Sequence, residues 1–162
     1  MAATLALTGA AAGALAEPLP PPTGPVILTV TGSIDNRNTE SGAQFDLEML
    51  EALGTTELRT STSWTEGTPV FEGVLGRRLL DAVGARGARA VGRALNDYSI
   101  AIPLSDFRDL PLLLALKMNG QYLKVRDGGP IWIIYPWDQH PDLVNEETKQ
   151  KSIWQLTELQ VE

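Results

Sequence analysis

The sequence predicts one mixed α+β domain whose sheets are largely antiparallel. Short segments with strand character outnumber the helical ones, and the helices do not alternate regularly with the strands. Residues 112–118 and 121–125 flank Asn119-Gly120, the strongest two-residue hairpin signal in the chain. The 162 residues suffice for one domain with a substantial core, so we expect a single folded unit.

The chain is organised around residues 126–138. Ile131 to Tyr135 is an apolar run of β-branched and aromatic residues that is too short for a helix, and it predicts a buried strand. The segment 127–130 before it, Asp-Gly-Gly-Pro, predicts a tight turn because glycine allows positive φ or close backbone approach. Three large aromatic residues accompany this strand: Trp132, Tyr135 and Trp137.

The first half of the folded chain predicts two helices and two further strands. Asp46 is positioned to cap a helix over residues 47–53, which Gly54 ends. Gly84 ends a second helix over residues 75–83. Strands are predicted over residues 26–31 and over the threonine-rich residues 55–64.

The second half predicts another hairpin and one short helix. Asn96-Asp97 is a turn signal between strands at 88–95 and 98–102. Ser105 is predicted to cap a helix that ends at Leu110. A polar excursion over 138–150 then separates the central strand from a last apolar and polar segment over 153–161.

Composition excludes several classes of function. The formal net charge is −7, so we expect neither non-specific nucleic-acid binding nor binding to anionic membranes. The absence of cysteine excludes disulfides, thiolate zinc sites and cysteine nucleophiles, and the single histidine, His140, lies in a polar loop. Five arginines between residues 77 and 93 form the only basic neighbourhood, which we interpret as a solvated face or, alternatively, an anion or partner contact.

The N-terminus predicts export. Residues 1–16 are mostly Ala, Leu, Gly and Thr, and Ala14-Leu15-Ala16 has the small-x-small form of a signal-peptidase site. No Lys or Arg precedes the apolar part, so a leader of a cytoplasmic protein is the alternative. We expect a signal peptide at 1–16, a proline-rich linker at 17–24, a folded domain at 25–162, a periplasmic location and no membrane span after cleavage.

Aromatic and small polar residues are the candidates for a ligand site. Trp64, Trp132 and Trp154 lie near turns or small residues, where indoles can stack on a flat heterocycle. Asn96, Asp97 and Asp127 could bind the polar edge of such a ring, because carboxylates accept N–H bonds. Core packing is the alternative role for each tryptophan taken singly. The sequence indicates no catalytic carboxylate pair and no metal site.

Several segments, in the same order, resemble the molybdopterin-binding domain of the sulfite oxidase superfamily, over about residues 25–161. The resemblance implies that superfamily's α+β fold. The matching segments are Thr60-Ser-Thr-Ser-Trp64, Phe71-Glu-Gly-Val74, Asn96-Asp-Tyr98 with the following Ser-Ile-Ala-Ile-Pro-Leu104, Leu112-Leu-Leu-Ala-Leu-Lys-Met-Asn-Gly120, Gly128-Gly-Pro-Ile131 and Lys151-Ser-Ile-Trp-Gln-Leu156.

Three departures from the family pattern bear on function. Thr60 stands where the family has the cysteine that binds molybdenum, and a hydroxyl is a poor replacement for a soft thiolate. Trp132 follows Gly-Pro-Ile where the family often has a phosphate-binding arginine, and Trp154 stands in place of a lysine. Loss of the thiolate and exchange of cations for indoles favour an uncharged, unphosphorylated pterin over molybdopterin.

The resemblance is greatest to small, cysteine-less, periplasmic pterin-binding regulators. It implies a non-catalytic protein that binds a reduced pterin and contacts the periplasmic domain of a membrane-bound cyclic di-GMP enzyme. A molybdopterin-dependent oxidoreductase with atypical metal ligation and a scaffold without a ligand are the alternatives. The predicted ligand-binding residues are Thr60, Ser61, Trp64, Asn96, Asp97, Tyr98, Asp127, Gly128, Gly129, Trp132, Lys151, Ser152 and Trp154.

Overall fold

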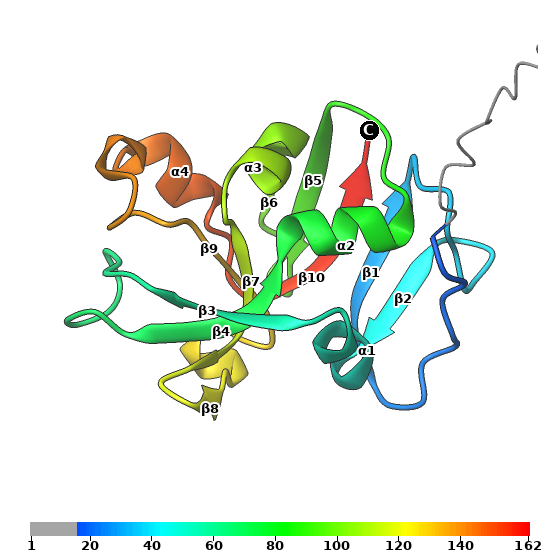
Figure 1. Ribbon diagram of the computed structural model, residues 1–162, viewed down its shortest axis with the longest axis horizontal. Helices are drawn as coiled ribbons and strands as arrows, with labels where there is room; N and C mark the ends of the chain where they lie inside the picture. Colours follow the sequence, from blue (N-terminus) through cyan, green and yellow to red (C-terminus); the bar gives the residue numbers. More distant parts are fainter. Residues whose placement is uncertain (1–15) are drawn as a thin grey trace, which may run out of the picture.

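The computed structural model describes residues 16–162 and shows two sheets around one shared core (Figure 1). The first sheet has the order β2-β1-β10-β5-β6, and only the pair β1 and β10 is parallel. Its strands are β1 (Val26–Gly32), β2 (Ala43–Asp46), β5 (Arg89–Ala94), β6 (Ser99–Pro103) and β10 (Leu156–Val161). Apart from Ala16, the predicted signal peptide lies outside the described residues.

The second sheet is antiparallel throughout. It has the order β3-β4-β7-β8, and β9 pairs with residues 113–115 of β7, beyond the part that pairs with β8. The chain is therefore a mixed, largely antiparallel α+β domain, as the sequence predicts. The strands of this sheet are β3 (Thr55–Arg59), β4 (Val70–Leu75), β7 (Leu113–Met118), β8 (Gln121–Tyr122) and β9 (Trp132–Ile134).

Within residues 16–162, four short α-helices lie beside the sheets. The Asp46 carboxylate accepts a hydrogen bond from the Met49 amide at 2.8 Å and caps the first helix, as its sequence position predicts. Gly84 ends the second helix in the left-handed conformation, with a φ of 60°. The helices are α1 (Leu47–Ala52), α2 (Gly76–Val83), α3 (Leu104–Asp109) and α4 (Glu146–Lys151).

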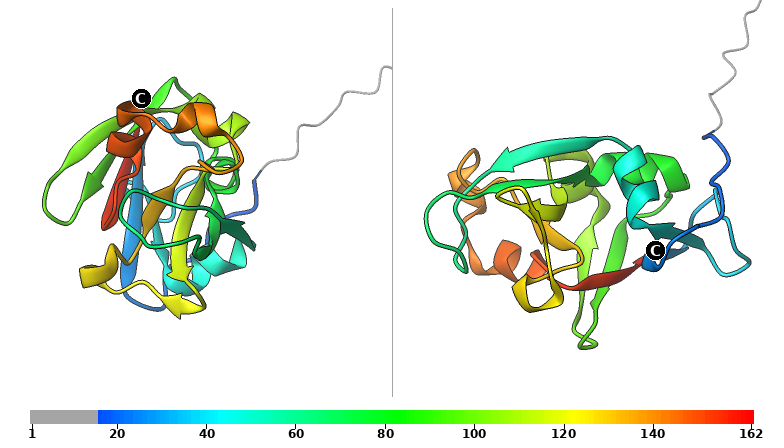
Figure 2. Two further views of the ribbon diagram at one scale, coloured as in Figure 1. Left: turned by 90° about the vertical axis from the view of Figure 1, so that its left-hand side faces the viewer. Right: turned by 90° about the horizontal axis from the view of Figure 1, so that it is seen from below.

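Both predicted hairpins are present, and the β5–β6 hairpin projects from the body of the domain (Figure 2). Asp97, Asn119 and Gly120 have positive φ angles, which explains why Asn-Asp and Asn-Gly occupy the two turns. The central strand is confirmed over 132–134, where all three residues are buried.

The structure differs from the prediction in five details. The strand predicted over 55–64 ends at Arg59, because residues 60–69 form the loop that returns to β4. Residues 70–75 form a strand before the second helix, and β8 ends at Tyr122. The third helix begins at Leu104 after Pro103, so Ser105 is not its cap. The polar excursion contains α4 and a 3₁₀ turn over Pro141–Leu143.

The proline-rich segment 17–24 lies against the domain. The Asn36 side-chain amide donates to the Glu17 carbonyl at 2.7 Å. The Asp46 carboxylate accepts hydrogen bonds from the Thr23 and Gly24 amides, each at 2.9 Å. Asp46 therefore connects this segment to the start of α1. Over residues 16–162, no helix is both long and apolar enough to cross a membrane.

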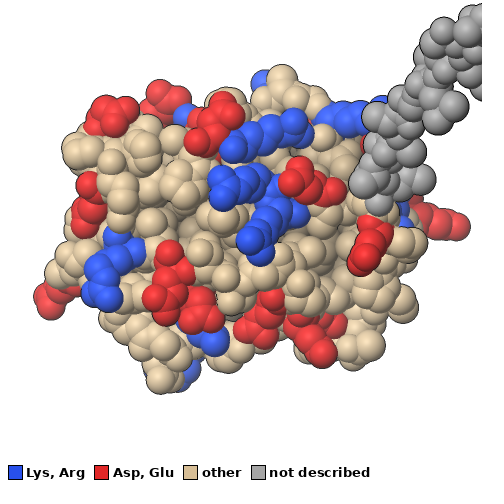
Figure 3. All heavy atoms as spheres, viewed as in Figure 1, with Lys and Arg blue, Asp and Glu red and all other residues tan. Residues whose placement is uncertain are grey.

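The predicted basic neighbourhood is an exposed, partly neutralised surface. Lys and Arg side chains gather over α2 and α3 in Figure 3. Arg86 pairs with Asp35 at 2.6 Å, and Arg89 pairs with Glu162 at 2.7 Å. These pairs agree with the interpretation as a solvated face.

Candidate functional site

The four tryptophans form one cluster, although three separate segments supply them. The Trp64 ring centroid lies 5.9 Å from that of Trp132, 6.1 Å from Trp137 and 6.4 Å from Trp154. Trp132 and Trp137 are 3% and 5% exposed, whereas Trp64 and Trp154 are each 44% exposed. The cluster therefore has a buried half that belongs to the core and an exposed half that faces solvent.

Backbone geometry brings the segments of this cluster together. Gly128 has a φ of 96°, and a Cβ there would lie 3.2 Å from the Trp132 ring and 3.5 Å from the Trp154 Cβ. The Gln155 amide donates to the Gly128 carbonyl at 2.8 Å, which holds the turn before β9 against the chain after α4. Gly128 is needed for this close approach.

The buried indoles satisfy their N–H groups within the protein. The Trp132 Nε1 donates to the Ser152 carbonyl at 3.3 Å, and the Trp137 Nε1 donates to the Thr148 hydroxyl at 3.1 Å. Both bonds connect the central strand region to α4 and the residue after it. Trp132 and Trp137 thus form a fixed backing for the two exposed indoles.

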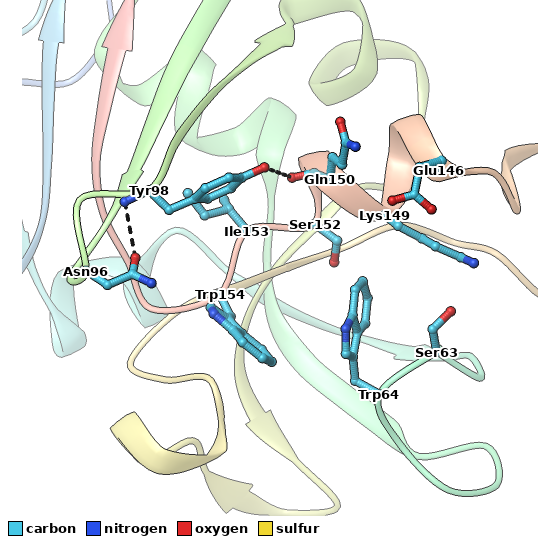
Figure 4. A pocket seen from close by; sticks show the side chains of 10 residues that line it. All are labelled: Ser63, Trp64, Asn96, Tyr98, Glu146, Lys149, Gln150, Ser152, Ile153 and Trp154. Carbon is cyan, nitrogen blue, oxygen red and sulfur yellow. Dashed lines mark hydrogen bonds between the residues drawn. The ribbon is translucent and has the colours of Figure 1, made fainter.

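A cavity of about 460 Å³ lies between the exposed indoles and α4 (Figure 4). This volume is in the usual range for sites that hold small organic ligands. Trp64 and Trp154 project into it, and the Tyr98 hydroxyl donates to the Gln150 carbonyl at 3.1 Å beside it. The lining residues are Ser63, Trp64, Asn96, Tyr98, Glu146, Lys149, Gln150, Ser152, Ile153 and Trp154.

A second cavity of about 290 Å³ shares the same two indoles. Trp64 and Trp154 line both cavities, so the exposed indoles separate a larger compartment from a smaller one. Asp127, Gly128 and Trp132 line the smaller compartment.

The structure brings eight of the thirteen predicted ligand residues to these compartments. Five line the larger compartment: Trp64, Asn96, Tyr98, Ser152 and Trp154. Asp127, Gly128 and Trp132 line the smaller one. Stacking by Trp132 is not supported, because its indole is packed between Phe71, Trp64 and Trp154.

Lys151 lies outside both compartments. Its ammonium group is 2.6 Å from the Glu147 carboxylate and 3.2 Å from that of Asp106, which also accepts a 2.7 Å hydrogen bond from the buried Tyr135 hydroxyl. Desolvation lowers the pKa of Lys151, but the two carboxylates outweigh it and raise that pKa overall. Lys151 therefore fixes α4 to α3.

Thr60 and Ser61 are structural residues of the loop after β3. The fully buried Thr60 hydroxyl donates to the Ser61 carbonyl and accepts from the Asp138 amide, both at 3.1 Å. The Ser61 hydroxyl and amide both donate to the Asp138 carboxylate, at 2.5 and 2.9 Å. These bonds, with the Ser61 hydroxyl contributing most, lower the pKa of Asp138.

Asp97 and Gly129 also lie outside both compartments. Asp97 occupies the tip of the β5–β6 hairpin, and its amide donates to the Ala94 carbonyl. A Cβ at Gly129 would lie 2.2 Å from the Leu123 carbonyl oxygen, so glycine is required there by backbone packing.

Two charged residues that line the larger compartment, Glu146 and Lys149, were not among the ligand residues predicted from the sequence. Both lie on α4, in the excursion that the sequence analysis left without structure. Asn145 caps this helix by accepting from the Thr148 amide at 2.9 Å. Asparagine followed by two acidic residues is a helix-start signal that would have revealed α4.

The chain is a small α+β domain with an aromatic-walled cavity of the size that holds small organic ligands. Residues 28–139 match the family model described as "Oxidoreductase molybdopterin binding domain". The chain therefore belongs to this family, which confirms the sulfite oxidase-type superfamily and indicates a pterin-type cofactor. No curated protein matches the chain.

A solved structure supports the fold. Sulfane dehydrogenase SoxCD from Paracoccus pantotrophus superposes with a TM-score of 0.58 at 16% sequence identity. The match covers 83% of this chain and 37% of the SoxCD chain, so the present chain spans little more than a third of that protein.

The residues present fit a pterin ring and do not fit its molybdenum. Both hydrogen-bonding functions of the Thr60 hydroxyl are already used within the protein. The aromatic walls and polar ends of the larger compartment do suit a flat heterocycle.

Proposed function

We propose that this protein is a non-catalytic pterin-binding protein that takes an unphosphorylated, reduced pterin into the larger compartment, between the exposed indoles of Trp64 and Trp154 and helix α4. One contrast carries the proposal. The residue at the metal-ligand position, Thr60, is fully buried and hydrogen-bonded, while two indoles at the cavity are each 44% exposed. These features support a site that offers aromatic faces to a ring and has lost the family's metal-binding side chain.

Stacking supplies the affinity. A heterocycle between Trp64 and Trp154 would cover indole surface that is now exposed to water. Trp132 and Trp137 lie behind these indoles and limit how far they can retreat. The indole of Trp154 therefore offers a stacking face that is already in place, whereas the Trp64 ring, inclined by 52° to it, has to turn to stack on the same ligand.

The charges around the cavity support an unphosphorylated ligand. Its lining contains one ammonium group, that of Lys149, and one carboxylate, that of Glu146. A phosphate ester near neutral pH carries close to two negative charges, which Glu146 would oppose. Lys151 cannot compensate, because Glu147 and Asp106 already hold its ammonium group.

We further propose that the protein acts in the periplasm and regulates a membrane-bound cyclic di-GMP enzyme through that enzyme's periplasmic domain. Support comes from the resemblance to small cysteine-less regulators and from the leader-like residues 1–16. We assign the partner-facing surface to the long polar segment 138–150, which includes most of α4, and α4 lines the cavity. Ligand contact with α4 would thus reach the partner-facing surface directly.

A molybdopterin-dependent oxidoreductase is the second candidate, because the matching family model describes an oxidoreductase domain. It requires a metal ligand other than the side chain at residue 60. A scaffold that kept the fold without a ligand is the third candidate.

The deciding experiment is analysis of the protein purified from its native host. The extract is oxidised and assayed for pterin fluorescence, and the protein is assayed for molybdenum. Pterin without molybdenum is the expected result. Stoichiometric molybdenum would overturn the proposal in favour of the oxidoreductase. Neither signal, together with no thermal shift on adding pterins, would favour the scaffold.

A further inference from the structure

We infer that Glu146 and Lys149 together bind the pyrimidinone edge of the ligand, so that the site selects 2-amino-4-oxopteridines over 2,4-dioxopteridines. The inference rests on the proposed function, since it concerns the same compartment. It assigns chemical selectivity to two residues of α4.

The two faces of α4 differ in how their charges are used. On one face, Glu147 and Lys151 form an ion pair at 2.6 Å, which Asp106 extends. On the other face, Glu146 and Lys149 line the cavity, and neither side chain has a hydrogen-bond or ion-pair partner among residues 16–162. The charges that stabilise the fold are paired, and those that face the cavity are open to a ligand.

The positions of these two residues match the edge of a pterin. Residues three apart lie next to each other on one face of a helix. A pterin presents, in order, an amino donor at C2, an N–H donor at N3 and a carbonyl acceptor at C4. A carboxylate accepts both N–H bonds, and the neighbouring ammonium group donates to the carbonyl.

The opposite end of the cavity has a different character. Figure 4 shows Asn96 and Tyr98 at one end, with Glu146 and Lys149 at the other. The Asn96 carbonyl already accepts from the Tyr98 amide at 3.2 Å, and the Tyr98 hydroxyl donates to Gln150. The end with Glu146 and Lys149 is therefore better placed to bind a ring edge that carries two hydrogen-bond donors. The rest of the ring would lie toward Asn96.

The 2-oxo analogue lumazine tests this assignment, because it replaces the C2 amino donor by an acceptor. Binding of pterin and of lumazine to the full chain is measured by quenching of intrinsic tryptophan fluorescence. We expect pterin to bind about tenfold more tightly or better, the value of one charge-assisted hydrogen bond. Glu146→Gln should remove most of this preference, since its amide can face either analogue.

Matched variants complete the test. Lys149→Met should weaken both ligands by a similar factor, because both keep the C4 carbonyl. Glu66→Gln, on an exposed loop and outside the cavity lining, should change neither affinity. Equal affinity of the unmodified protein for pterin and lumazine, or an unchanged preference in folded Glu146→Gln, would overturn the inference alone. Binding of neither ring would overturn the proposed function and this inference with it.

Discussion

The indole of Trp64 lies 6.4 Å from that of Trp154, centroid to centroid, with 52° between the two ring planes. A heterocycle stacked on both would require more nearly parallel planes. Trp154 follows the buried Ser152 and Ile153, whereas Trp64 lies in the loop between β3 and β4. We therefore expect Trp64 to turn when a ligand binds and Trp154 to stay in place.

Loss of either exposed indole should weaken pterin binding. Trp64→Leu and Trp154→Leu should each raise the Kd about tenfold, because each removes one stacking face and part of the buried area. Titration calorimetry with a reduced pterin measures this. The control is Tyr122→Leu, which removes an exposed aromatic residue that lines neither compartment. Unchanged affinity in both tryptophan variants would show that the ligand does not bind at these indoles.

Trp132 is expected to matter for stability, in contrast to Trp154. Trp132→Ala should lower the free energy of unfolding by about 3–5 kcal/mol, because it leaves a cavity beneath the cluster. Trp154→Ala should lower the free energy of unfolding much less, since that indole is 44% exposed. Urea unfolding of the two variants gives the comparison. A Trp132→Ala protein of normal stability and lost affinity would instead make Trp132 a ligand contact.

Short-range signals predicted the fold well. Asp46, Gly84, Asn119 and Gly120 act through their own backbone or the nearest helix turn, so local sequence was enough to place them. The strand predicted over 55–64 ends at Arg59, and the next residue, Thr60, is engaged by a distant part of the chain, because its hydroxyl accepts from the Asp138 amide. Sequence alone carries no sign of such a contact.

The candidate site was predicted in its aromatic part and missed in its charged part. Residue type indicated Trp64 and Trp154, since large aromatics near turns often meet a ligand. The family resemblance suggested Lys151, yet its ammonium group is held by Asp106, a residue 45 positions away. Which lysine of α4 faces the cavity depends on how the helix is docked, and tertiary contacts decide that.

Thr60 offers a test of the structural role assigned to it. Thr60→Val keeps the shape but leaves the Ser61 carbonyl and the Asp138 amide without this partner, so stability should fall by about 1–3 kcal/mol. The stability of Thr60→Ser, which retains the hydroxyl, should fall by less. Pterin affinity should be the same in both folded variants. Guanidinium unfolding with a binding titration provides both readouts, and a strong loss of affinity in Thr60→Val alone would place residue 60 at the ligand.

Asp46 makes part of the stability depend on pH. The Gly24 amide, followed by those of Met49 and Thr23, holds the pKa of Asp46 below its ordinary value. A carboxyl group with a lowered pKa in the folded state stabilises the protein above its unfolded pKa of about 3.9. This contribution is lost as the pH falls through the folded pKa, because the protonated group no longer accepts these bonds as well.

Unfolding midpoints in urea from pH 7 down to about pH 2 measure this dependence. Asp46→Ala should lower the urea midpoint at pH 7. It should also reduce the decrease of the midpoint below about pH 4, so that only the decrease caused by other carboxylates, such as Asp138, remains. Asp142→Ala, at an exposed acidic position, should leave the curve unchanged. If Asp46→Ala and the unmodified protein lose stability in parallel on acidification, the connection between residues 17–24 and α1 does not depend on the charge of Asp46.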